Sequence, residues 1–388
     1  MSALDDALAA VLNSRLSYCK FLSANDTGEN GSHQAGIYIA KNAWPILFDA
    51  PGERGSNKSR RVRITWPDDL ATDSRFIYYG SGSRDEYRVT SFGRNFPWLR
   101  PRHTGSLFIL VKNDDDAYSA FALDSDEEMD RFMEATGVGP AETNSLIGPP
   151  SPDSLIIEAD AIREYVSSHD SFPSTAEMAR ASRGIWNLSH RDAGDSKTKP
   201  DATLLRWIDT EYRLFRSLEI ALYLPRAREG FENMDEFLNL ANTALNRRKS
   251  RAGASFELHL AALFSANELS FTSQARTEGN RRPDFIFPSE DAYRDPSFPV
   301  EKLVMLAAKT TCKDRWRQIL TEAGRLDGRI KYLCTLQQGV SRDQLDEMEE
   351  ERVRLVVPKE YLSSFPADRR QRIWTLERFI AFAGSLND

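Results

Sequence analysis

The spacing of apolar residues divides the chain into an initial helix, a run of short strands, and a longer stretch that mixes helices and strands. Near the start, apolar positions recur at helical spacing behind a possible N-cap, Ser2, which predicts a helix with the face Leu4, Leu8, Val11, Leu12 and Leu16. Short apolar segments follow, separated by Gly, Asn, Asp and Ser clusters, around residues 37–39, 62–66, 76–78, 89, 107–111 and 118–123. Such strands predict a mostly-β sheet that closes on itself or packs as a sandwich, and a helix follows at 126–135.

A change of composition then marks a boundary. The run Gly148-Pro149-Pro150-Ser151-Pro152 disfavours both helix and strand, which makes it the predicted linker. A helix over 158–168 is predicted inside the connection. The chain is therefore expected to have an N-terminal domain over 1–147, a hinge over 148–171 and a C-terminal domain over 172–388.

The C-terminal domain shows helical patterns first and alternation afterwards. A long amphipathic helix covers 204–221 and is expected to stop at Pro225, and two more helices are predicted at 234–245 and 255–266. Strands are predicted at 285–287, 303–308, 331–336 and 353–357, with helices at 313–326, 342–350 and 374–386. This alternation predicts an α/β domain whose central mixed sheet is flanked by helices.

Composition narrows the class of protein. The charged fraction of 28% and hydrophobic fraction of 40% are those of a globular chain, and the sequence contains neither a membrane-length apolar run nor a secretion signal at its start. Three widely spaced cysteines fit a reducing cytoplasm. Taken alone, the net charge of −7 argues against a nucleic-acid partner. The positions of the charges are compatible with one, because cations gather at 247–251, 276–282 and 309–317.

Three ionisable residues occupy unusual places in these patterns. Asp284 opens the apolar strand 285–287, Lys309 ends the apolar run 303–308, and Glu322 follows on the helix predicted after it. Charges at the ends of buried strands are costly without partners. Two carboxylates that converge with a lysine suit Mg²⁺-assisted phosphodiester hydrolysis, since oxygen ligands bind the metal and the lysine can stabilise the transition state. A structural ion pair at the sheet end is the competing interpretation.

Basic residues near this trio suggest contact with DNA. The triplet Lys313, Asp314 and Arg315 follows Lys309, and Arg can bind guanine while Asp can accept from cytosine N4. Possible phosphate contacts are Arg247, Arg248, Lys249, Arg251, Arg281 and Arg282. The alternative for each group is a solvated helix end or a solvated charged face.

Several long segments resemble one family. NRRKSRAGASFELHLAALF, TEGNRRPDFIFPS and LAAKTTCKDRWRQILTEAGR resemble the catalytic domain of the EcoRII restriction endonuclease family, and LSANDTGENGSHQAGIYI is similar to its effector DNA-binding domain. The resemblance implies a type II restriction endonuclease with a PD-(D/E)xK nuclease domain behind an N-terminal B3-like pseudobarrel. It implies Mg²⁺ as cofactor, double-stranded DNA as substrate, a homodimer, a prokaryotic cytoplasmic location without membrane attachment, and a cognate DNA methyltransferase.

The resemblance also assigns roles to individual residues. It implies that Asp284 and Glu322 bind Mg²⁺, that Lys309 is the catalytic lysine, and that Glu257 is an accessory acid. Ala307 stands where the acidic residue two before the lysine is usual, and Glu322 takes over its function. Residues Lys313, Asp314 and Arg315 would contact the outer C·G pairs of a CCWGG-like site, and the effector domain would use His33, Tyr38, Arg84, Glu86 and Arg88.

Two other functions are compatible with the sequence. A DNA-binding regulator could keep the nuclease fold without catalysis, although the intact Asp284, Lys309 and Glu322 speak against it. Tyr293, which matches a family tyrosine once suspected as a nucleophile, could carry strand transfer, but the sequence shows no activating base beside it. The type II restriction endonuclease, with the N-terminal domain binding a second copy of the site, is the prediction of choice.

Overall fold

The structure is a computed structural model that describes residues 2–31, 36–68, 70–93, 96–113, 117–147, 156–189 and 196–386. The chain forms two compact units. Unit 1 comprises 1–149 together with 337–347 and 361–371, and unit 2 comprises 150–336, 348–360 and 372–388. Two segments from the C-terminal half of the sequence therefore belong to the same unit as the N-terminal domain.

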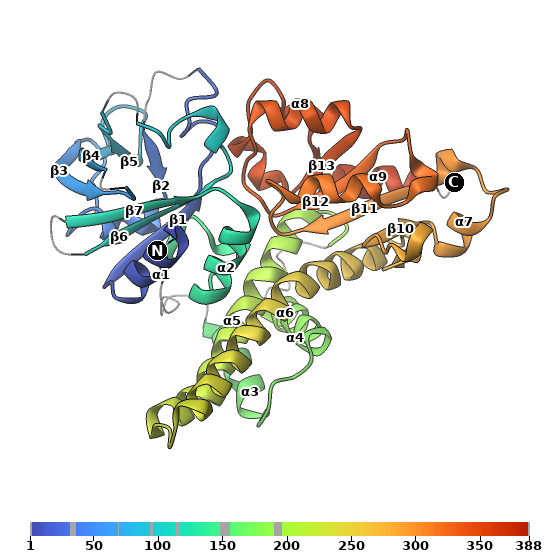
Figure 1. The fold of residues 1–388 in the computed structure, drawn as a ribbon, viewed down its shortest axis with the longest axis horizontal. Helices are drawn as coiled ribbons and strands as arrows, with labels where there is room; N and C mark the ends of the chain where they lie inside the picture. The colour runs from blue at the N-terminus through green and yellow to red at the C-terminus, as the bar shows by residue number, and fades with distance from the viewer. Residues whose placement is uncertain are drawn as a thin grey trace. The chain divides into compact units, whose positions relative to one another are not determined.

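Unit 1 is built on a mostly antiparallel sheet (Figure 1). Its strand order is β2-β5-β4-β3-β7-β6-β1-β8, and the β3–β7 pair is parallel. The strands are β1 (Leu16–Phe21), β2 (Ile37–Ile39), β3 (Lys58–Thr65), β4 (Ala71–Tyr79), β5 (Glu86–Thr90), β6 (Leu107–Lys112), β7 (Ala117–Leu123) and β8 (Ser145–Ile147). The predicted sheet of many short strands is confirmed.

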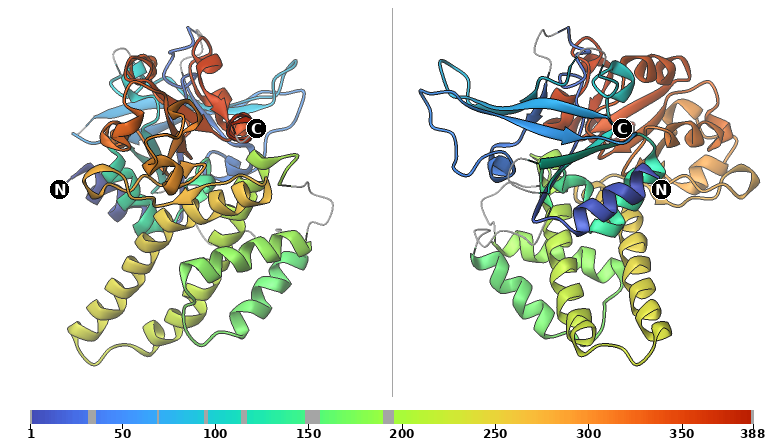
Figure 2. Two further views of the ribbon diagram at one scale, coloured as in Figure 1. Left: turned by 90° about the vertical axis from the view of Figure 1, so that its right-hand side faces the viewer. Right: turned by 60° about the vertical axis from the view of Figure 1, so that its left-hand side comes forward.

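The burial pattern of these strands explains how the sheet is covered. In β6, Phe108 and Leu110 enter one hydrophobic core while Leu107, Ile109 and Val111 enter another, so both faces are buried. The second core lies under helices α1 (Ala3–Leu12) and α2 (Asp126–Thr136), which supply Leu4 and Phe132. By contrast, β3 alternates between buried and exposed positions, and Figure 2 shows β3 and β4 as a long ribbon.

The two predicted helices of unit 1 are present, but the face predicted for the first was too long, since Leu12 is exposed and Leu16 begins β1. Ser2 forms a capping box with Asp5 at the start of α1. Ser125 caps α2, whose end is Gly137 in the left-handed conformation at φ 70°. Both helices were predicted, the first from its spacing and the possible cap Ser2. Short 3₁₀ turns complete the N-terminal part of unit 1 at η1 (Lys41–Ile46), η2 (Pro101–His103) and η3 (Pro140–Glu142).

Unit 2 contains a mixed sheet with the order β14-β13-β12-β11-β10-β9. Its strands are β9 (Thr272–Ser273), β10 (Phe285–Phe287), β11 (Val304–Lys309), β12 (Lys331–Thr335), β13 (Val353–Val357) and β14 (Trp374–Thr375). Strands β11 to β14 are parallel, whereas β10 is antiparallel to both neighbours. The predicted mixed α/β sheet is confirmed.

Several α-helices pack with this sheet or extend from it. They are α3 (Ile156–Ser167), α4 (Thr175–Ser189), α5 (Pro200–Glu229), α6 (Met234–Ala266), α7 (Glu290–Arg294) and α9 (Leu376–Ser385), and α8 (Arg342–Glu350) spans the boundary between the units. Helices α5 and α6 form a hairpin that extends away from the sheet, with α3 and α4 beside it (Figures 1 and 2). At its other end α6 meets the sheet, where the Phe264 ring lies 5.2 Å from that of Phe285.

Three helix predictions were wrong. Helix α5 continues through Pro225, which lies exposed near the end of the helix, where a lost backbone hydrogen bond can be replaced by water. The helices predicted at 234–245 and 255–266 are one 33-residue helix, α6, because Arg248 binds Glu219 of α5 and bridges the polar segment between them. Helix α4 was not predicted, and the predicted linker 148–152 lies outside the described residues.

The segment 313–326 is the third wrong helix. It forms 3₁₀ helices, η6 (Arg315–Thr321) and η7 (Gly324–Leu326), instead of one α-helix. The buried residues Trp316 and Ile319 are three positions apart, which is the period of a 3₁₀ helix. Other short turns in unit 2 are η4 (Glu278–Asn280) and η5 (Val300–Lys302), and η8 (Lys359–Ser364) and η9 (Arg370–Arg372) cross the unit boundary.

In the part of the chain that the structure describes, every helix is too short or too polar to cross a membrane.

Asp201 joins the start of α5 to the start of α9. Its buried carboxylate accepts backbone hydrogen bonds from Lys359, Leu376 and Glu377, each at 2.9 Å. Asp201→Ala leaves these donors unsatisfied, so we expect the free energy of unfolding to fall by about 3 kcal/mol. Urea denaturation checks this value. Glu229→Ala, at an exposed position near the other end of the same helix, is the control, and an equal loss in both variants would contradict the account.

Candidate active site

Two neighbouring strands bring the first two predicted site residues together. Asp284 directly precedes β10 and Lys309 ends β11, and the antiparallel register pairs Phe285 with Leu306. The start of one strand therefore meets the end of the other. Lys309 Nζ lies 3.0 Å from Asp284 Oδ2, and the Ala308 backbone N–H donates to the same oxygen at 2.8 Å.

Asp284 is buried, and these contacts compensate for the loss of water around its charge. The ammonium group of Lys309 is partly exposed, with a quarter of its side chain accessible. An ammonium and a backbone N–H that meet the same oxygen fix the direction of the carboxylate. Its other oxygen, Oδ1, faces the Gln274 amide at 3.1 Å.

Glu322 was expected on an α-helix, and this placement was wrong. It follows the 3₁₀ helix η6 as its C-terminal cap, in an extended conformation. Its carboxylate is half-buried, and Oε2 finds no hydrogen-bond partner among the described residues. Burial raises the pKa of Glu322 to about 7, with Lys309 lowering it and Asp284 raising it. The charges of Lys309 and Asp284 are thus two of the influences on the Glu322 carboxylate.

Glu257 approaches the same place from α6. The Nε2 group of Gln274 lies 2.8 Å from Glu257 Oε2 as well as 3.1 Å from Asp284 Oδ1, so one amide bridges the two carboxylates. Since ionised carboxylates only accept hydrogen bonds, the amide nitrogen is the atom that faces them. The pKa of Glu257 is raised by burial and by the charge of Asp284. No sequence pattern indicated Gln274, which adopts a left-handed backbone at φ 52°.

A divalent cation fits this group of residues. Carboxylate oxygens are the ligands that Mg²⁺ prefers, and the buried Oε2 atom of Glu322 lacks a partner among the described residues. Within the described part of the chain, three or more acidic, His or Cys side chains are nowhere arranged closely enough to hold a metal unaided. Water, as is usual for Mg²⁺, would complete the coordination.

Tyr293 lies near the site but is held by other residues. Its side chain is buried, and its hydroxyl donates to the Glu278 carboxylate at 2.7 Å. Burial and the Glu278 carboxylate raise the pKa of the Tyr293 phenol well above its usual range. A phenol that holds its proton more firmly is a poorer nucleophile at neutral pH, which disfavours the strand-transfer alternative.

The three residues predicted to contact bases differ in exposure. Lys313 is buried, Asp314 is exposed and Arg315 is half-buried. Arg315 is the first residue of η6, Asp314 is its N-cap and Lys313 comes just before; Glu322 is the C-cap of the same element. The base-recognition segment and the Glu322 carboxylate are therefore on one short, continuous stretch of chain.

The predicted phosphate contacts have separate environments. Arg248 binds Glu219, Arg251 is buried against the rings of Tyr212 and Phe215, and Arg247 lies over Phe172. Lys249, Arg281 and Arg282 are exposed, and the Arg281 guanidinium donates to the Thr321 carbonyl.

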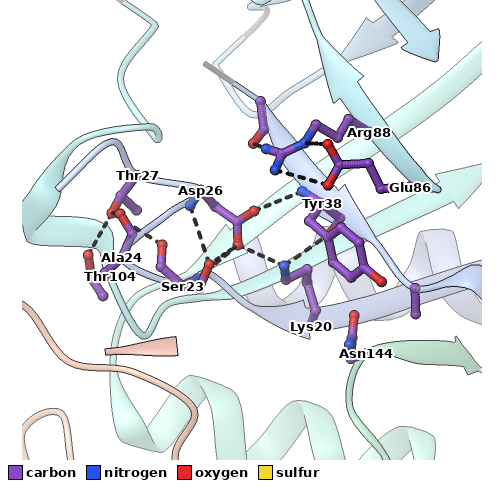
Figure 3. A network of polar contacts seen from close by, with 12 residues as sticks. Lys20, Ser23, Ala24, Asp26, Thr27, Tyr38, Glu86, Arg88, Thr104 and Asn144 are labelled. Carbon is purple, nitrogen blue, oxygen red and sulfur yellow. Dashed lines mark hydrogen bonds and ion pairs between the residues drawn. The ribbon is translucent and has the colours of Figure 1, made fainter. Parts of the chain in front are cut away.

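The predicted effector residues lie in unit 1. His33 lies outside the described residues, and Tyr38 is half-buried on β2. Arg88 is buried and pairs with Glu86 at 3.2 Å (Figure 3), whereas Arg84 is exposed and lies over the Tyr79 ring. Next to Arg84, the Asp85 carboxylate forms ion pairs with Lys41 and Arg54. Hydrogen bonds from Lys41, Tyr78 and Arg54 lower the pKa of Asp85 to about 2.

Asp26 organises the loop before the effector residues, and the sequence did not single it out. As Figure 3 shows, its carboxylate meets Lys20 Nζ at 2.7 Å, the Ser23 backbone N–H at 2.9 Å and the Tyr38 backbone N–H at 2.8 Å. Both charged side chains are buried. The pair therefore fixes the start of β2 relative to the end of β1.

An acid after a proline, paired across adjacent strands of a mixed sheet with a lysine, is the arrangement of the PD-(D/E)xK nucleases, and unit 2 has this class of fold. The family model described as "EcoRII C terminal" matches residues 215–380, and that described as "Restriction endonuclease EcoRII, N-terminal" matches residues 12–152. The chain belongs to the EcoRII family of type II restriction endonucleases, with a mostly-β domain before the nuclease domain.

A relative from Escherichia coli supports this assignment. The chain is 38% identical over 391 aligned positions to the type II restriction enzyme EcoRII of Escherichia coli, covering 94% of this chain and 93% of the relative. A structure of metal-depleted Ecl18kI in complex with uncleaved, modified DNA is similar at 19% identity and a TM-score of 0.45, over 59% of this chain and 83% of that chain. A PspGI–substrate DNA complex is similar at 16% identity and a TM-score of 0.46, over 55% and 93%.

Proposed function

We propose that this enzyme hydrolyses both strands of duplex DNA at a CCWGG-like site with Mg²⁺. The observation that carries the proposal is the Asp284–Lys309 contact in a chain of the EcoRII family, and the buried Glu322 Oε2, which has no hydrogen-bond partner among the described residues, supports it. Asp284 and Glu322 are the proposed metal ligands, Lys309 the catalytic lysine and Glu257 the accessory acid. The proposed assignment places catalysis in 172–388 and effector binding in 1–147, joined by the hinge 148–171.

The chain's own groups have distinct tasks in this reaction. The metal, when bound, polarises the phosphate and promotes ionisation of water. The Ala308 N–H and Lys309 hold Asp284 in a fixed direction, which prepares one ligand before the metal arrives. The ammonium of Lys309, partly exposed at the site, stabilises the negative charge that develops on the phosphoryl oxygens.

Recognition of the site is proposed for the segment that leads into η6. Arg315 has the geometry to donate two hydrogen bonds to guanine, and the exposed Asp314 can accept from cytosine N4. Lys313 is buried in the DNA-free structure, so its contact with a base requires a local rearrangement of this segment. The proposed phosphate contacts are Lys249, Arg281, Arg282 and Arg247. Arg248 and Arg251 are also proposed, but each would first have to leave its present contacts within the protein.

A homodimer is proposed because a two-fold symmetric site is matched most simply by a two-fold symmetric protein. The α5–α6 hairpin exposes large apolar side chains: Ile220, Leu224, Met234, Phe237, Leu238 and Leu245. Burying such a surface between copies would be favourable. The enzyme would act in a prokaryotic cytoplasm together with a methyltransferase that protects the host's own sites.

An effector role is proposed for the N-terminal domain. Within unit 1, the loop after β1 binds segments from the C-terminal half of the chain: Glu29 Oε1 accepts from the Arg342 N–H at 2.6 Å, and the Ala24 N–H donates to the Ser364 carbonyl at 2.8 Å. DNA bound at Tyr38 would act on a loop that is in contact with segments continuous with the catalytic sheet. This is a physical route by which a second site could control cleavage.

Asp26→Ala tests the effector role. It leaves Lys20 buried without its anion and releases the Tyr38 N–H, so we expect stimulation of cleavage by an added site-containing duplex to fall about tenfold or more. Cleavage rates with and without that duplex measure it. Asp73→Ala, at an exposed ion pair of the same unit, is the control. Undiminished stimulation of the Asp26→Ala enzyme would contradict the effector assignment.

Plasmid digestion tests the proposed reaction itself. Plasmids with no CCWGG site, one site or two sites are incubated with the enzyme, with Mg²⁺ or with EDTA. Linear products from site-containing plasmids in Mg²⁺ alone are expected. If the purified enzyme binds these plasmids but cuts none of them with Mg²⁺, the DNA-binding regulator replaces the nuclease as the best account.

A further inference from the structure

The loop that carries Glu322 has a strained backbone. Ala323, directly after Glu322, is buried and adopts the left-handed conformation at φ 50°, which costs a non-glycine residue on the order of 1 kcal/mol or more. Such a conformation persists only where the surroundings enforce it. Because Ala323 follows the proposed metal ligand, whatever enforces its conformation also sets the direction of the Glu322 side chain.

One carboxylate holds the strained turn from outside the loop. Glu278 accepts hydrogen bonds from the backbone N–H groups of Gly324 at 3.0 Å and Arg325 at 3.2 Å. The same carboxylate accepts a hydrogen bond from the Tyr293 hydroxyl. The Tyr293 oxygen in turn accepts a hydrogen bond from the Arg325 N–H at 3.1 Å. Glu278 and Tyr293 thus bind the residues that follow Ala323.

Arg325 closes the arrangement from the opposite direction. Its guanidinium donates to the carbonyls of Ala292, Tyr293 and Phe298, with the last at 2.7 Å. The loop is therefore tied to α7 through backbone donors in one direction and through a side chain in the other. Glu278, Tyr293 and Arg325 are called the latch below.

The other side of the loop has an independent anchor. The buried Lys331 ammonium donates to the carbonyls of Leu320 at 2.7 Å and Glu322 at 2.5 Å, and it meets Asp327 at 3.1 Å. Loss of the latch would leave this anchor in place. The loop would then relax around Ala323 while the fold of unit 2 persists.

We propose that Glu278 and Tyr293 are positioning residues that hold the Ala323 turn and thereby direct the Glu322 carboxylate toward Asp284 and Lys309. They act through Glu322 and not on the substrate. This inference rests on the proposed role of Glu322 as a metal ligand. It gives Tyr293 a function in the nuclease that requires neither a covalent intermediate nor an activating base.

The test uses the full-length enzyme with Tyr293→Phe and, separately, Glu278→Gln. The first removes the hydroxyl that joins Glu278 to Arg325, and the second keeps the shape but removes the charge that accepts the N–H groups. Tyr332→Phe is the matched control, since Tyr332 is a buried tyrosine on β12 packed against Trp374 and Phe379. Calorimetric titration with Mg²⁺ measures metal binding, and single-turnover cleavage is followed against Mg²⁺ concentration.

The latch predicts weaker metal binding with intact chemistry. The dissociation constant for Mg²⁺ should rise about tenfold in both variants, which is the change that loss of one hydrogen bond of about 1.4 kcal/mol produces. At saturating Mg²⁺ the cleavage rate should return to within about twofold of the wild type, and Tyr332→Phe should match the wild type throughout. Partial recovery of Mg²⁺ affinity in Glu278→Asp, which keeps the charge, would support the same conclusion.

Contrary outcomes separate the latch from the proposed function. Unchanged Mg²⁺ affinity in both variants, while Glu322→Gln weakens it, overturns the latch and leaves the metal site standing. Cleavage that is lost at every Mg²⁺ concentration with normal metal binding also overturns it, because Tyr293 would then act directly in the reaction. A wild-type enzyme that neither binds Mg²⁺ nor cuts DNA overturns the proposed function and the latch together.

Discussion

Replacing Lys309 by alanine is expected to lower the single-turnover rate of DNA cleavage by on the order of 10³-fold or more while leaving DNA binding intact. The ammonium lies 3.0 Å from Asp284 Oδ2 and is the group proposed to stabilise charge at the reacting phosphate. The alanine variant removes that stabilisation and one of the groups that hold the Asp284 carboxylate. Gel-quench cleavage assays in Mg²⁺ measure the rate, and gel-shift assays in EDTA measure binding.

Lys302→Ala is the control for this variant. Lys302 belongs to η5, just before the opposite end of β11, so it tests for loss of a lysine near the strand without loss of the catalytic group. It should cut at the wild-type rate. A Lys309→Ala enzyme that retains more than about a tenth of wild-type activity would be too active for the electrostatic role assigned to this lysine.

Glu322→Gln is expected to reduce cleavage at moderate Mg²⁺ by about 10²-fold or more, because it removes the charge from a proposed metal ligand. The same residue predicts a pH dependence in the wild type. Burial raises the pKa of Glu322 to about 7 in the metal-free enzyme. Above that pH the carboxylate is ionised and can bind Mg²⁺; below it, the metal must displace a proton, so apparent Mg²⁺ affinity should fall up to about tenfold per pH unit.

Mg²⁺ titrations between pH 5.5 and 8.5 test this dependence in the wild type, Glu322→Gln and the exposed control Glu301→Gln. The control should follow the wild-type curve. The glutamine variant should bind weakly, and the steep part of the curve below pH 7 should disappear. Mg²⁺ affinity that is constant over the whole range in the wild type would show that Glu322 is not the group that binds the metal.

The pairing of Asp284 and Lys309 could be predicted because both are charges at the ends of apolar strands. In the structure these strands, β10 and β11, are neighbours in the sheet. Glu322 was proposed as a site residue from the sequence, but the α-helix predicted around it was wrong. The spacing of Trp316 and Ile319 fits a 3₁₀ helix, and a pattern judged over the whole of 313–326 does not separate a 3₁₀ helix from an α-helix. Gln274 and Glu278 could not be found from the sequence, because their contacts depend on left-handed turns at Gln274 and Ala323 that local propensity does not indicate.

The same limits apply to the fold. The strand pattern of the N-terminal domain was sufficient to predict its β-sheet, and α1 was predicted from its apolar spacing and the possible cap Ser2. Pro225 was predicted to end one helix, and 234–245 and 255–266 were predicted as separate helices, yet α5 continues through Pro225 and α6 is continuous from Met234 to Ala266. The assignment of segments 337–347 and 361–371 to unit 1 depends on long-range contacts, such as Glu29 with Arg342, that no local pattern encodes.

Mapping the ends of the DNA products tests the central claim most directly. Plasmid DNA is digested by the wild-type enzyme in Mg²⁺, and both strands of the products are sequenced to their termini, with the Lys309→Ala enzyme alongside. The account predicts breaks in both strands at CCWGG-like sites, with 5′-phosphate and 3′-hydroxyl ends, and none with Lys309→Ala. Breaks unrelated to any sequence, ends covalently linked to protein, or intact DNA with the wild type would contradict it.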